Sequence, residues 1–306
     1  YLKKLGCSPL RWKGITEVPS ERKQVTYKDG KQESYDTLLI ASGSQPTTLS
    51  IKGLEEVGFA TFHTLDDCRG LKQQLAGKQD VTIYGGGLVA VELTIALLEA
   101  GYRVKLIVRS RILRRYFDQE AGDMIKGIII SRGAQIYEGT QIEEVERGQK
   151  RIEVALSNGN AVDTDIIAIA LGVRPSVPFL EGSGVKVGNG VVVDHRMRTN
   201  IEDIYAAGDV AESPDFFTGI PGLNPILPSA VDQGTIAGSN MSGEEADYEG
   251  WLSMNILSFF GHRALSIGTL DGNGLQILKV SDARKKQYKK LAYKDGRLVG
   301  ASFVDI

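Results

Sequence analysis

Residues 199–209 read Thr-Asn-Ile-Glu-Asp-Ile-Tyr-Ala-Ala-Gly-Asp. The compact apolar run from Ile204 to Ala207 predicts a short buried strand. Gly208 permits a tight turn at the carboxyl end of that strand, where open α/β sheets bind their ligands. Asp209 is then placed to accept hydrogen bonds from sugar-alcohol hydroxyls. The alternative is an ordinary buried strand that ends in an acid-capped turn.

Residues 81–138 alternate strand-like and helix-like patterns, as expected of parallel βαβ units. The apolar spacing gives each element, and Gly133 marks the end of the second helix. The predicted elements are a strand over 81–84, a helix over 88–100, a strand over 104–108, a helix over 118–132 and a strand around Ile136. The sequence therefore predicts one nucleotide-binding α/β unit here.

A glycine-rich turn, Gly85-Gly86-Gly87-Leu88-Val89-Ala90-Val91-Glu92, joins the first of these strands to the first helix. Gly85 permits the turn, and Gly87 lets a pyrophosphate approach the positive amino end of the helix. Ala90 stands where the third glycine of the fingerprint usually stands, a variation that the pattern allows. A glycine turn between a strand and a helix predicts a dinucleotide site.

Arg109 follows the second strand, about 20 residues beyond the glycines, where an acid would bind a ribose 2′-hydroxyl. Arg109, Arg111, Arg114 and Arg115 offer guanidinium groups suited to a 2′-phosphate instead. This favours NADPH over NADH. The alternative is a solvated basic loop in a protein that accepts either nucleotide.

Composition excludes several classes of protein. The 306 residues contain 36 basic and 38 acidic side chains, for a net charge of −2, so no global charge favours nucleic acid or an anionic membrane. No apolar run approaches the ~18 residues needed to span a bilayer, and we expect a cytoplasmic protein without a membrane span.

Cysteine and histidine give no sign of thiol or metal chemistry. Cys7 and Cys68 are far apart, and we expect each to be a small buried apolar residue; Cys68 shares a helical face with Leu71 and Leu75. The three histidines lie in no catalytic motif or ligand cluster, so we expect no metal and interpret them as structural or solvated: His63, His195 and His262.

The stretch from Thr199 to Asp209 resembles the flavin-ribityl motif of the FAD-dependent pyridine nucleotide-disulfide oxidoreductase family. Residues 35–46, Tyr-Asp-Thr-Leu-Leu-Ile-Ala-Ser-Gly-Ser-Gln-Pro, resemble its crossover, and 170–175, Ala-Leu-Gly-Val-Arg-Pro, its return crossover. Residues 253–261 resemble the entry to its interface domain. The family includes rubredoxin and ferredoxin reductases, NADH oxidases and coenzyme A-disulfide reductases.

The resemblance implies an α/β fold in which a Rossmann-like NAD(P) domain is inserted into a Rossmann-like flavin domain, followed by a partial α+β interface domain. We expect the flavin domain to comprise 1–51 and 174–246, the NAD(P) domain 52–173, and the interface domain 247–306, which typically makes these proteins homodimers. The family's FAD fingerprint is not found before Tyr35. We therefore expect a chain truncated at both ends, with part of the flavin site outside it.

The resemblance also assigns site residues. Helix 228–241 would point its amino end at the flavin, although an ordinary buried helix is the alternative. Glu92 would lie near the nicotinamide, with a solvated glutamate as its alternative, and Leu88 lacks the family's aromatic ring. The expected FAD contacts are Ala41, Ser42, Gly43, Gly208, Asp209, Ser229, Ala230 and Gln233. The expected NAD(P) contacts are Gly85, Gly87, Leu88, Val89, Glu92, Arg109, Arg111 and Gly172.

The activity implied is hydride transfer from NAD(P)H to FAD, for which the protein positions two cofactors and supplies no catalytic side chain. We favour a small redox protein such as rubredoxin or ferredoxin as the acceptor. The alternatives are a disulfide or coenzyme A-disulfide reductase, or an NAD(P)H oxidase. A different class of function also stays open, that of a non-catalytic flavoprotein scaffold that senses nucleotides.

Overall fold

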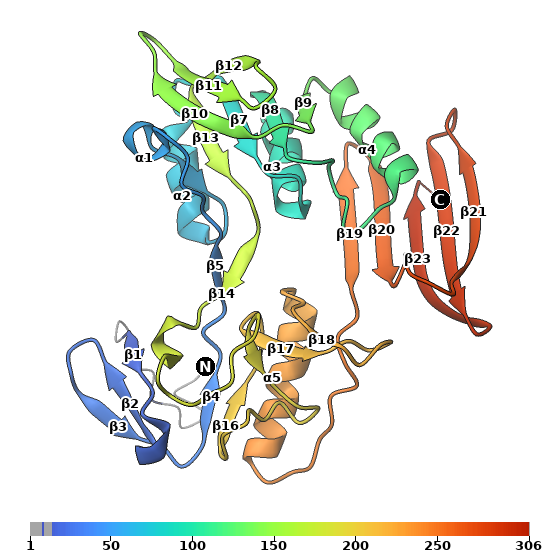
Figure 1. The fold of residues 1–306 in the computed structure, drawn as a ribbon. Helices are drawn as coiled ribbons and strands as arrows, with labels where there is room; N and C mark the ends of the chain where they lie inside the picture. Colours follow the sequence, from blue (N-terminus) through green and yellow to red (C-terminus); the bar gives the residue numbers. More distant parts are fainter. Residues whose placement is uncertain (1–7, 9–13, 306) are drawn as a thin grey trace. The chain divides into compact units, whose positions relative to one another are not determined.

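The computed structural model describes Ser8 and residues 14–305 (Figure 1). The chain divides into two compact units. The first unit is Tyr1–Ser44 with Arg174–Leu252, and the second unit is Gln45–Val173 with Ser253–Ile306. The chain leaves the first unit near Ser44 and returns to it near Arg174. Both positions lie in the predicted crossovers.

The second unit contains a five-stranded parallel sheet, which includes the three parallel strands that the sequence predicts. Val81 lies opposite Ile166 on one side and Val104 on the other, which sets the register of the three central strands. In spatial order the strands are β6 (Ala60–Thr61), β13 (Ile166–Ile169), β7 (Asp80–Tyr84), β8 (Arg103–Val108) and β9 (Gln135–Glu138). Their carboxyl ends share one edge, where the glycine-rich turn lies.

Alternate residues of the parallel strands face two different layers. Helices cover one face: α2 (Leu65–Gln74), α3 (Leu88–Glu99) and α4 (Gln119–Ser131). The other face packs on the short helix α1 (Leu54–Val57) and an antiparallel sheet of β10 (Ile142–Arg147), β11 (Ile152–Leu156) and β12 (Ala161–Thr164). Thus Leu106 points toward the helices and the adjacent Ile107 toward the antiparallel sheet.

Helix α2 begins with a capping box and packs only through its carboxyl half. Thr64 Oγ1 accepts from the Asp67 N–H at 3.1 Å, and the Asp67 carboxylate accepts from the Thr64 N–H at 2.8 Å. Leu71 is buried, but Cys68 is exposed, so the prediction of a buried Cys68 is wrong. The first turn carries no core contact, as the exposure of its other apolar residue, Leu65, also indicates. Cys7 lies outside the described residues.

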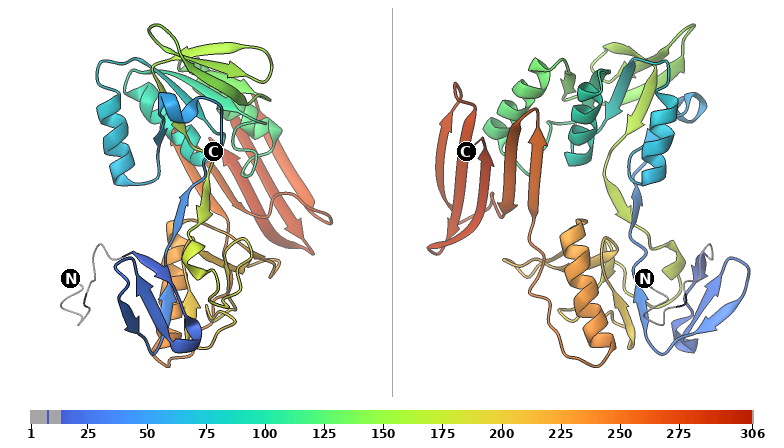
Figure 2. Two further views of the ribbon diagram at one scale, coloured as in Figure 1. Left: turned by 60° about the vertical axis from the view of Figure 1, so that its left-hand side comes forward. Right: turned by 180° about the vertical axis from the view of Figure 1, so that it is seen from behind.

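A five-stranded antiparallel sheet is formed by the last strands of the described chain. Several of its buried side chains belong to the hydrophobic core of the second unit. In spatial order the sheet consists of β19 (Met254–Phe259), β20 (His262–Gly268), β23 (Arg297–Val304), β22 (Gln287–Lys294) and β21 (Gln276–Asp282). Its inner face places Leu257, Phe259 and Tyr288 in the same hydrophobic cluster as α3 and α4. Figure 2 shows this sheet beside those helices from two sides. The division into three domains stays a prediction.

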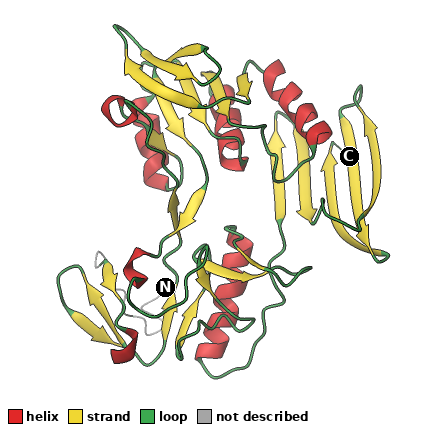
Figure 3. Cartoon of the chain, in the orientation of Figure 1, coloured by secondary structure: helices red, strands yellow, loops and turns green. Residues whose placement is uncertain are grey.

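The first unit is built on a parallel pair of strands, β4 (Leu38–Ile40) and β16 (Ile204–Ala206), with helix α5 (Leu227–Met241) packed against them (Figure 3). Ile40, Ile204 and Ala237 belong to its buried core. Smaller sheets complete the unit: β1 (Ile15–Glu17), β2 (Gln24–Tyr27) and β3 (Gln32–Ser34), and β15 (Val191–Val192), β17 (Ala211–Pro214) and β18 (Pro221–Gly222).

The two crossing segments pair with each other as β5 (Ser44–Pro46) and β14 (Val173–Pro175). Short 3-10 turns lie at Ser20–Arg22 and Pro178–Leu180. Within the described part of the chain, no helix is long and apolar enough to cross a membrane.

Candidate functional site

Asp209 lies directly beyond β16, where the turn made by Gly208 delivers its carboxylate. Gly208 has a φ of 80°, a conformation that favours glycine. Asp209 is half-buried, and its Oδ2 accepts a hydrogen bond from Ser44 Oγ at 2.7 Å. The predicted strand, turn and acid are therefore present, and the structure adds Ser44 as a partner that the sequence did not indicate.

Gln233 fixes the turn before Asp209. Its side chain is 2% exposed, its Oε1 accepts from the Gly208 N–H at 2.8 Å, and its Nε2 donates to Ser213 Oγ at 3.0 Å. A Cβ atom added at Gly208 would lie 3.5 Å from the Cβ of Ala230, in ordinary contact. Both ends of the Gln233 amide are thus engaged with the protein, so this side chain positions Gly208 and Asp209.

The amino end of α5 offers main-chain donors rather than free side chains. Ile226 precedes the helix without a side-chain cap, and Pro228 stands in the first turn. Ser229 is buried, and its Oγ accepts from Asn224 Nδ2 at 2.8 Å. Burial raises the pKa of the neighbouring Tyr248, against hydrogen bonds from Gln233 and Ser229 that lower it.

The first crossover is fastened to the second by hydrogen bonds. Ser42 Oγ donates to the carbonyl of Ser176 at 2.7 Å, and the Ser176 N–H donates to the carbonyl of Gly43 at 2.9 Å. Ala41 and Ser42 are exposed at the end of β4. These residues therefore lie beside Ser44 and Asp209 within the first unit, and their contact with a flavin stays a prediction.

The glycines of the nucleotide turn have different surroundings. A Cβ at Gly85, which has a φ of 147°, would lie 2.1 Å from the carbonyl oxygen of Ala170. A Cβ at Gly86 would lie 2.4 Å from a methyl group of Val108. No atom lies within 4 Å of the Cβ position at Gly87. Two glycines are thus needed for backbone packing, whereas Gly87 leaves open space at the amino end of α3.

That helix end is free to meet an anion. Gly87 precedes α3 without a side-chain cap, Leu88 is half-buried and Val89 is 45% exposed. Glu92 is on the exposed side of α3, where partial desolvation raises the pKa of its carboxyl. Gly172, beyond β13, has a φ of 94°, and its carbonyl accepts from the Thr47 N–H at 2.9 Å. These five site residues all belong to the second unit.

The segment 109–117 beyond β8, here called the arginine loop, presents three exposed guanidinium groups, from Arg109, Arg114 and Arg115. Arg111 differs from them. Its Nη2 donates to the carbonyl of Phe117 at 2.7 Å, and its Nη1 to that of Asp118 at 3.3 Å. The Arg111 guanidinium group therefore bonds to main-chain carbonyls at the end of the loop, and it is not turned to solvent as the other three are.

Two anchors of the arginine loop were not indicated by the sequence. Glu138, at the end of β9, accepts from the Ile112 N–H at 2.8 Å and pairs with Lys126 at 2.7 Å. Leu113 is fully buried with a φ of 52°, and its N–H donates to the carbonyl of Gly86 at 2.6 Å. The sequence signal that could have indicated Glu138 is its position at the carboxyl end of a parallel strand, the edge at which such sheets bind ligands.

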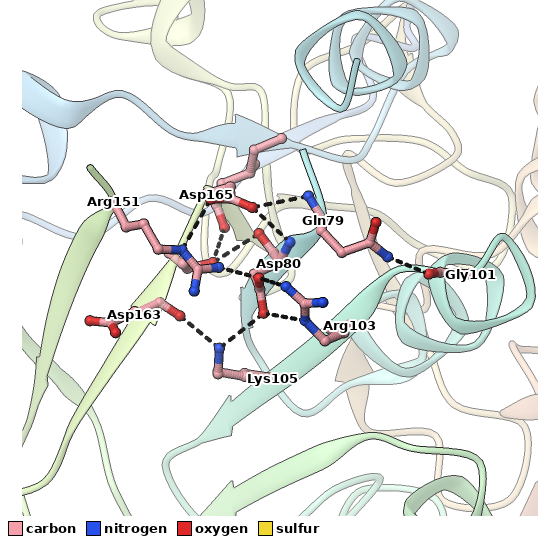
Figure 4. Close-up of polar contacts among 10 residues, drawn as sticks. Gln79, Asp80, Gly101, Arg103, Lys105, Arg151, Asp163 and Asp165 are labelled. Atoms are coloured by element: carbon pink, nitrogen blue, oxygen red, sulfur yellow. Dashed lines mark hydrogen bonds and ion pairs between the residues drawn. The ribbon is translucent and has the colours of Figure 1, made fainter. Parts of the chain in front are cut away.

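An ion cluster around the buried carboxylate of Asp80 occupies the opposite, amino-terminal edge of the parallel sheet (Figure 4). Asp80 is 4% exposed and pairs with Arg103, Lys105 and Arg151. The hydrogen bond from Arg103 is the main cause that lowers the pKa of Asp80, against desolvation. Asp165 accepts from the Asp80 N–H at 2.9 Å. Because the charges satisfy one another, this cluster joins strands of the unit.

Comparison with known proteins agrees with this arrangement. The family model described as pyridine nucleotide-disulphide oxidoreductase matches residues 10–234, and that of the rubredoxin NAD+ reductase C-terminal domain matches 254–304. The epsilon subunit of NADH-dependent phenylglyoxylate dehydrogenase from Aromatoleum evansii is 33% identical over 94% of this chain and 69% of its own length.

Two further relatives span the same region. NADH-rubredoxin oxidoreductase from Clostridium acetobutylicum is 30% identical over 84% of this chain and 63% of its own length. An engineered water-forming NADPH oxidase derived from Lactobacillus brevis, solved with NADPH, has a TM-score of 0.92 at 25% identity, over 99% of this chain and 72% of that one. The chain spans about 60% of the length of several curated relatives. It belongs to the pyridine nucleotide-disulphide oxidoreductase family.

Proposed function

We propose that the protein binds FAD through its first unit and NAD(P)H through its second unit, and that it catalyses electron transfer from NAD(P)H through the flavin to an acceptor. The observation that carries this proposal is the half-buried carboxylate of Asp209, which the Gly208 turn delivers to the end of β16 beside Ser44. The bound cofactors supply the chemistry, in which a hydride passes from the nicotinamide to the flavin.

The first unit holds the flavin by hydrogen bonding and by its helix end. Ser44 donates to Oδ2 of Asp209, and the carboxylate accepts further hydrogen bonds from hydroxyls of the ribityl chain. Gln233 keeps Gly208 in its turn, so that the carboxylate does not need to reorganise on binding. The amino end of α5 has no side-chain cap, and its partial positive charge would stabilise electron density on a flavin ring bound beside it.

The second unit holds the nucleotide at the edge where its parallel strands end. Gly87 leaves room for the pyrophosphate against the main-chain N–H groups of α3. Arg109, Arg114 and Arg115 are exposed, and the arginine loop carries no acidic residue that would repel a 2′-phosphate. These features favour NADPH as the reductant, whereas two of the relatives bear NADH in their names.

We propose a small redox protein of the rubredoxin or ferredoxin kind as the acceptor. The match of residues 254–304 to a rubredoxin NAD+ reductase domain supports it, as does the NADH-rubredoxin oxidoreductase relative. The proposal includes a homodimer formed through the antiparallel sheet, whose outer face exposes Ile256, Leu278 and Val280.

The test is steady-state NAD(P)H consumption by the full-length flavoprotein with four acceptors in parallel: rubredoxin, an artificial dye, molecular oxygen and coenzyme A disulfide. Turnover with the dye and rubredoxin that exceeds turnover with oxygen and the disulfide supports the proposal. Turnover with the disulfide or oxygen alone would favour the other enzyme classes. Bound flavin with near-zero turnover on every acceptor would indicate a nucleotide-sensing scaffold.

A further inference from the structure

Tyr288, on strand β22 of the antiparallel sheet, reaches the end of the arginine loop. Its side chain is 1% exposed and belongs to the hydrophobic cluster that α3 and α4 share. Its hydroxyl donates a hydrogen bond to Oδ2 of Asp118. The pKa of Tyr288 is raised by burial and further by this carboxylate, so the hydroxyl keeps its proton and stays a donor.

Asp118 joins the arginine loop to α4. Its Oδ1 accepts from the Ala121 N–H at 3.1 Å, which caps the helix, and its carbonyl accepts from Arg111 at 3.3 Å. The Gly122 N–H donates to the same carbonyl at 2.9 Å. Any displacement of Asp118 therefore disturbs both the amino-terminal cap of α4 and the hydrogen bond from Arg111.

Lys290 supports the same carboxylate from the next inward position of β22. It is 6% exposed, and its Nζ lies 3.7 Å from Oδ2 of Asp118 and 3.0 Å from Oδ1 of Asp271. The hydrogen bond from Tyr288 and the charge of Lys290 lower the pKa of Asp118 against desolvation, which acts in the opposite direction. Asp118 is thus an ionised group whose side-chain partners Tyr288 and Lys290 come from the antiparallel sheet.

The other side of the arginine loop is held within the nucleotide-binding region itself. Leu113 is bonded to Gly86 of the glycine turn, and Ile112 to Glu138 of β9. On the carboxyl side, Asp118 is held from a different sheet, by Tyr288 and Lys290 of β22. The stability of this attachment therefore depends on residues about 170 positions further along the chain.

We infer that Tyr288 and Lys290 are positioning residues for the arginine loop, through which the antiparallel sheet sets the affinity for the nicotinamide nucleotide. This inference rests on the proposed NAD(P)H site. Loss of a hydrogen bond to a charged group shifts a local equilibrium by about tenfold or more. The apparent Kd of the nucleotide equals the Kd of the closed loop divided by the fraction of molecules in which the loop is closed, so it rises as that fraction falls.

The experiment compares Tyr288→Phe with Tyr293→Phe in the full-length flavoprotein. Tyr293 lies on the opposite face of the same strand, half-buried, so its substitution is chemically identical but spares Asp118. Two readouts are taken. The first is trypsin cleavage after Arg114 and Arg115, with cleavage in the exposed turn at Lys285 and Lys286 as the internal reference. The second is the Kd for NADPH and NADH.

We expect Tyr288→Phe to raise cleavage of the arginine loop about tenfold and the nucleotide Kd about three- to tenfold, while cleavage of the reference turn stays at its original rate. Tyr293→Phe should change neither. Unchanged loop cleavage, an equal rise at both cleavage sites, or faster loop cleavage with an unchanged Kd would each overturn the inference. A wild-type protein that binds neither nucleotide would refute the proposed function instead, and loop cleavage would still decide whether Tyr288 holds the loop.

Discussion

Two glycines of one turn, Gly85 and Gly87, are predicted to respond in opposite ways to the same added methyl group. At Gly85 the new Cβ would overlap the Ala170 carbonyl oxygen, 2.1 Å away, and the residue would keep a φ of 147°. At Gly87 the Cβ meets no atom within 4 Å, and the φ of −81° suits any residue. The first substitution should therefore damage the fold, and the second only the ligand site.

The magnitudes follow from these surroundings. Gly85→Ala should lower the free energy of unfolding by about 2–5 kcal/mol, the sum of overpacking and a disfavoured φ. Gly87→Ala should cost less than about 1 kcal/mol, since alanine is only a poorer residue than glycine before a helix. Its methyl group would instead displace the pyrophosphate from one main-chain N–H. The loss of about 1.5–3 kcal/mol raises the Kd roughly 10- to 150-fold.

Urea unfolding and calorimetric titration with NADPH measure the two quantities on the full-length protein. Gly85→Ala should shift the unfolding midpoint strongly, whereas Gly87→Ala should leave it nearly unchanged and weaken NADPH and NADH alike, because both carry the pyrophosphate. If Gly87→Ala binds both nucleotides as tightly as the wild type, the pyrophosphate does not approach this turn, and the assignment of the nucleotide site is refuted.

Four further substitutions test separate features of the molecule. Asp209→Ala should lower the flavin content per protein, measured by absorbance, and leave nucleotide binding intact; a full complement of flavin would remove this site assignment. Arg109→Ala should weaken the binding of NADPH more than that of NADH. Arg111→Ala, which opens the arginine loop, should weaken the binding of both nucleotides. If Arg109→Ala weakens the binding of both nucleotides equally, Arg109 is a nonspecific surface charge. Asp80→Asn should lower the unfolding free energy at pH 7 by about 2–4 kcal/mol, because the cations around it lose their partner and two of them reach solvent. The pKa of Asp80 in the folded protein lies below the ordinary ~3.9. The stability that the Asp80 carboxylate contributes is therefore complete above about pH 4 and is lost as the pH falls through the folded-state pKa. A difference in unfolding free energy between wild type and Asp80→Asn that stays constant below pH 4 would contradict this.

Local sequence patterns predicted the elements that position the sites. The strand, glycine turn and helix over 80–99 are specified by a contiguous apolar run and by glycines whose roles are local. The same holds for β16 and the turn at Gly208. In both places the carboxyl end of a buried parallel strand fixes where a ligand can bind, so the motif and its spatial position follow from the same few residues.

The direction of individual side chains could not be predicted in this way. Arg111 turns back to the Phe117 carbonyl, although Arg109, two residues earlier, is exposed. Cys68 shares a helical face with Leu71 but lies in a turn that carries no core contact. The contact of Tyr288 with Asp118 joins two elements far apart in sequence. Each depends on which elements pack together, and this information is absent from local periodicity.

The proposed function requires that a nicotinamide nucleotide reduce a flavin held by this protein. An anaerobic absorbance titration of the full-length protein with NADPH, and separately with NADH, tests it most directly. We expect the flavin absorbance band to bleach with both nucleotides, and at a lower concentration of NADPH than of NADH. A colourless protein, or a bound flavin that neither nucleotide reduces, would contradict it.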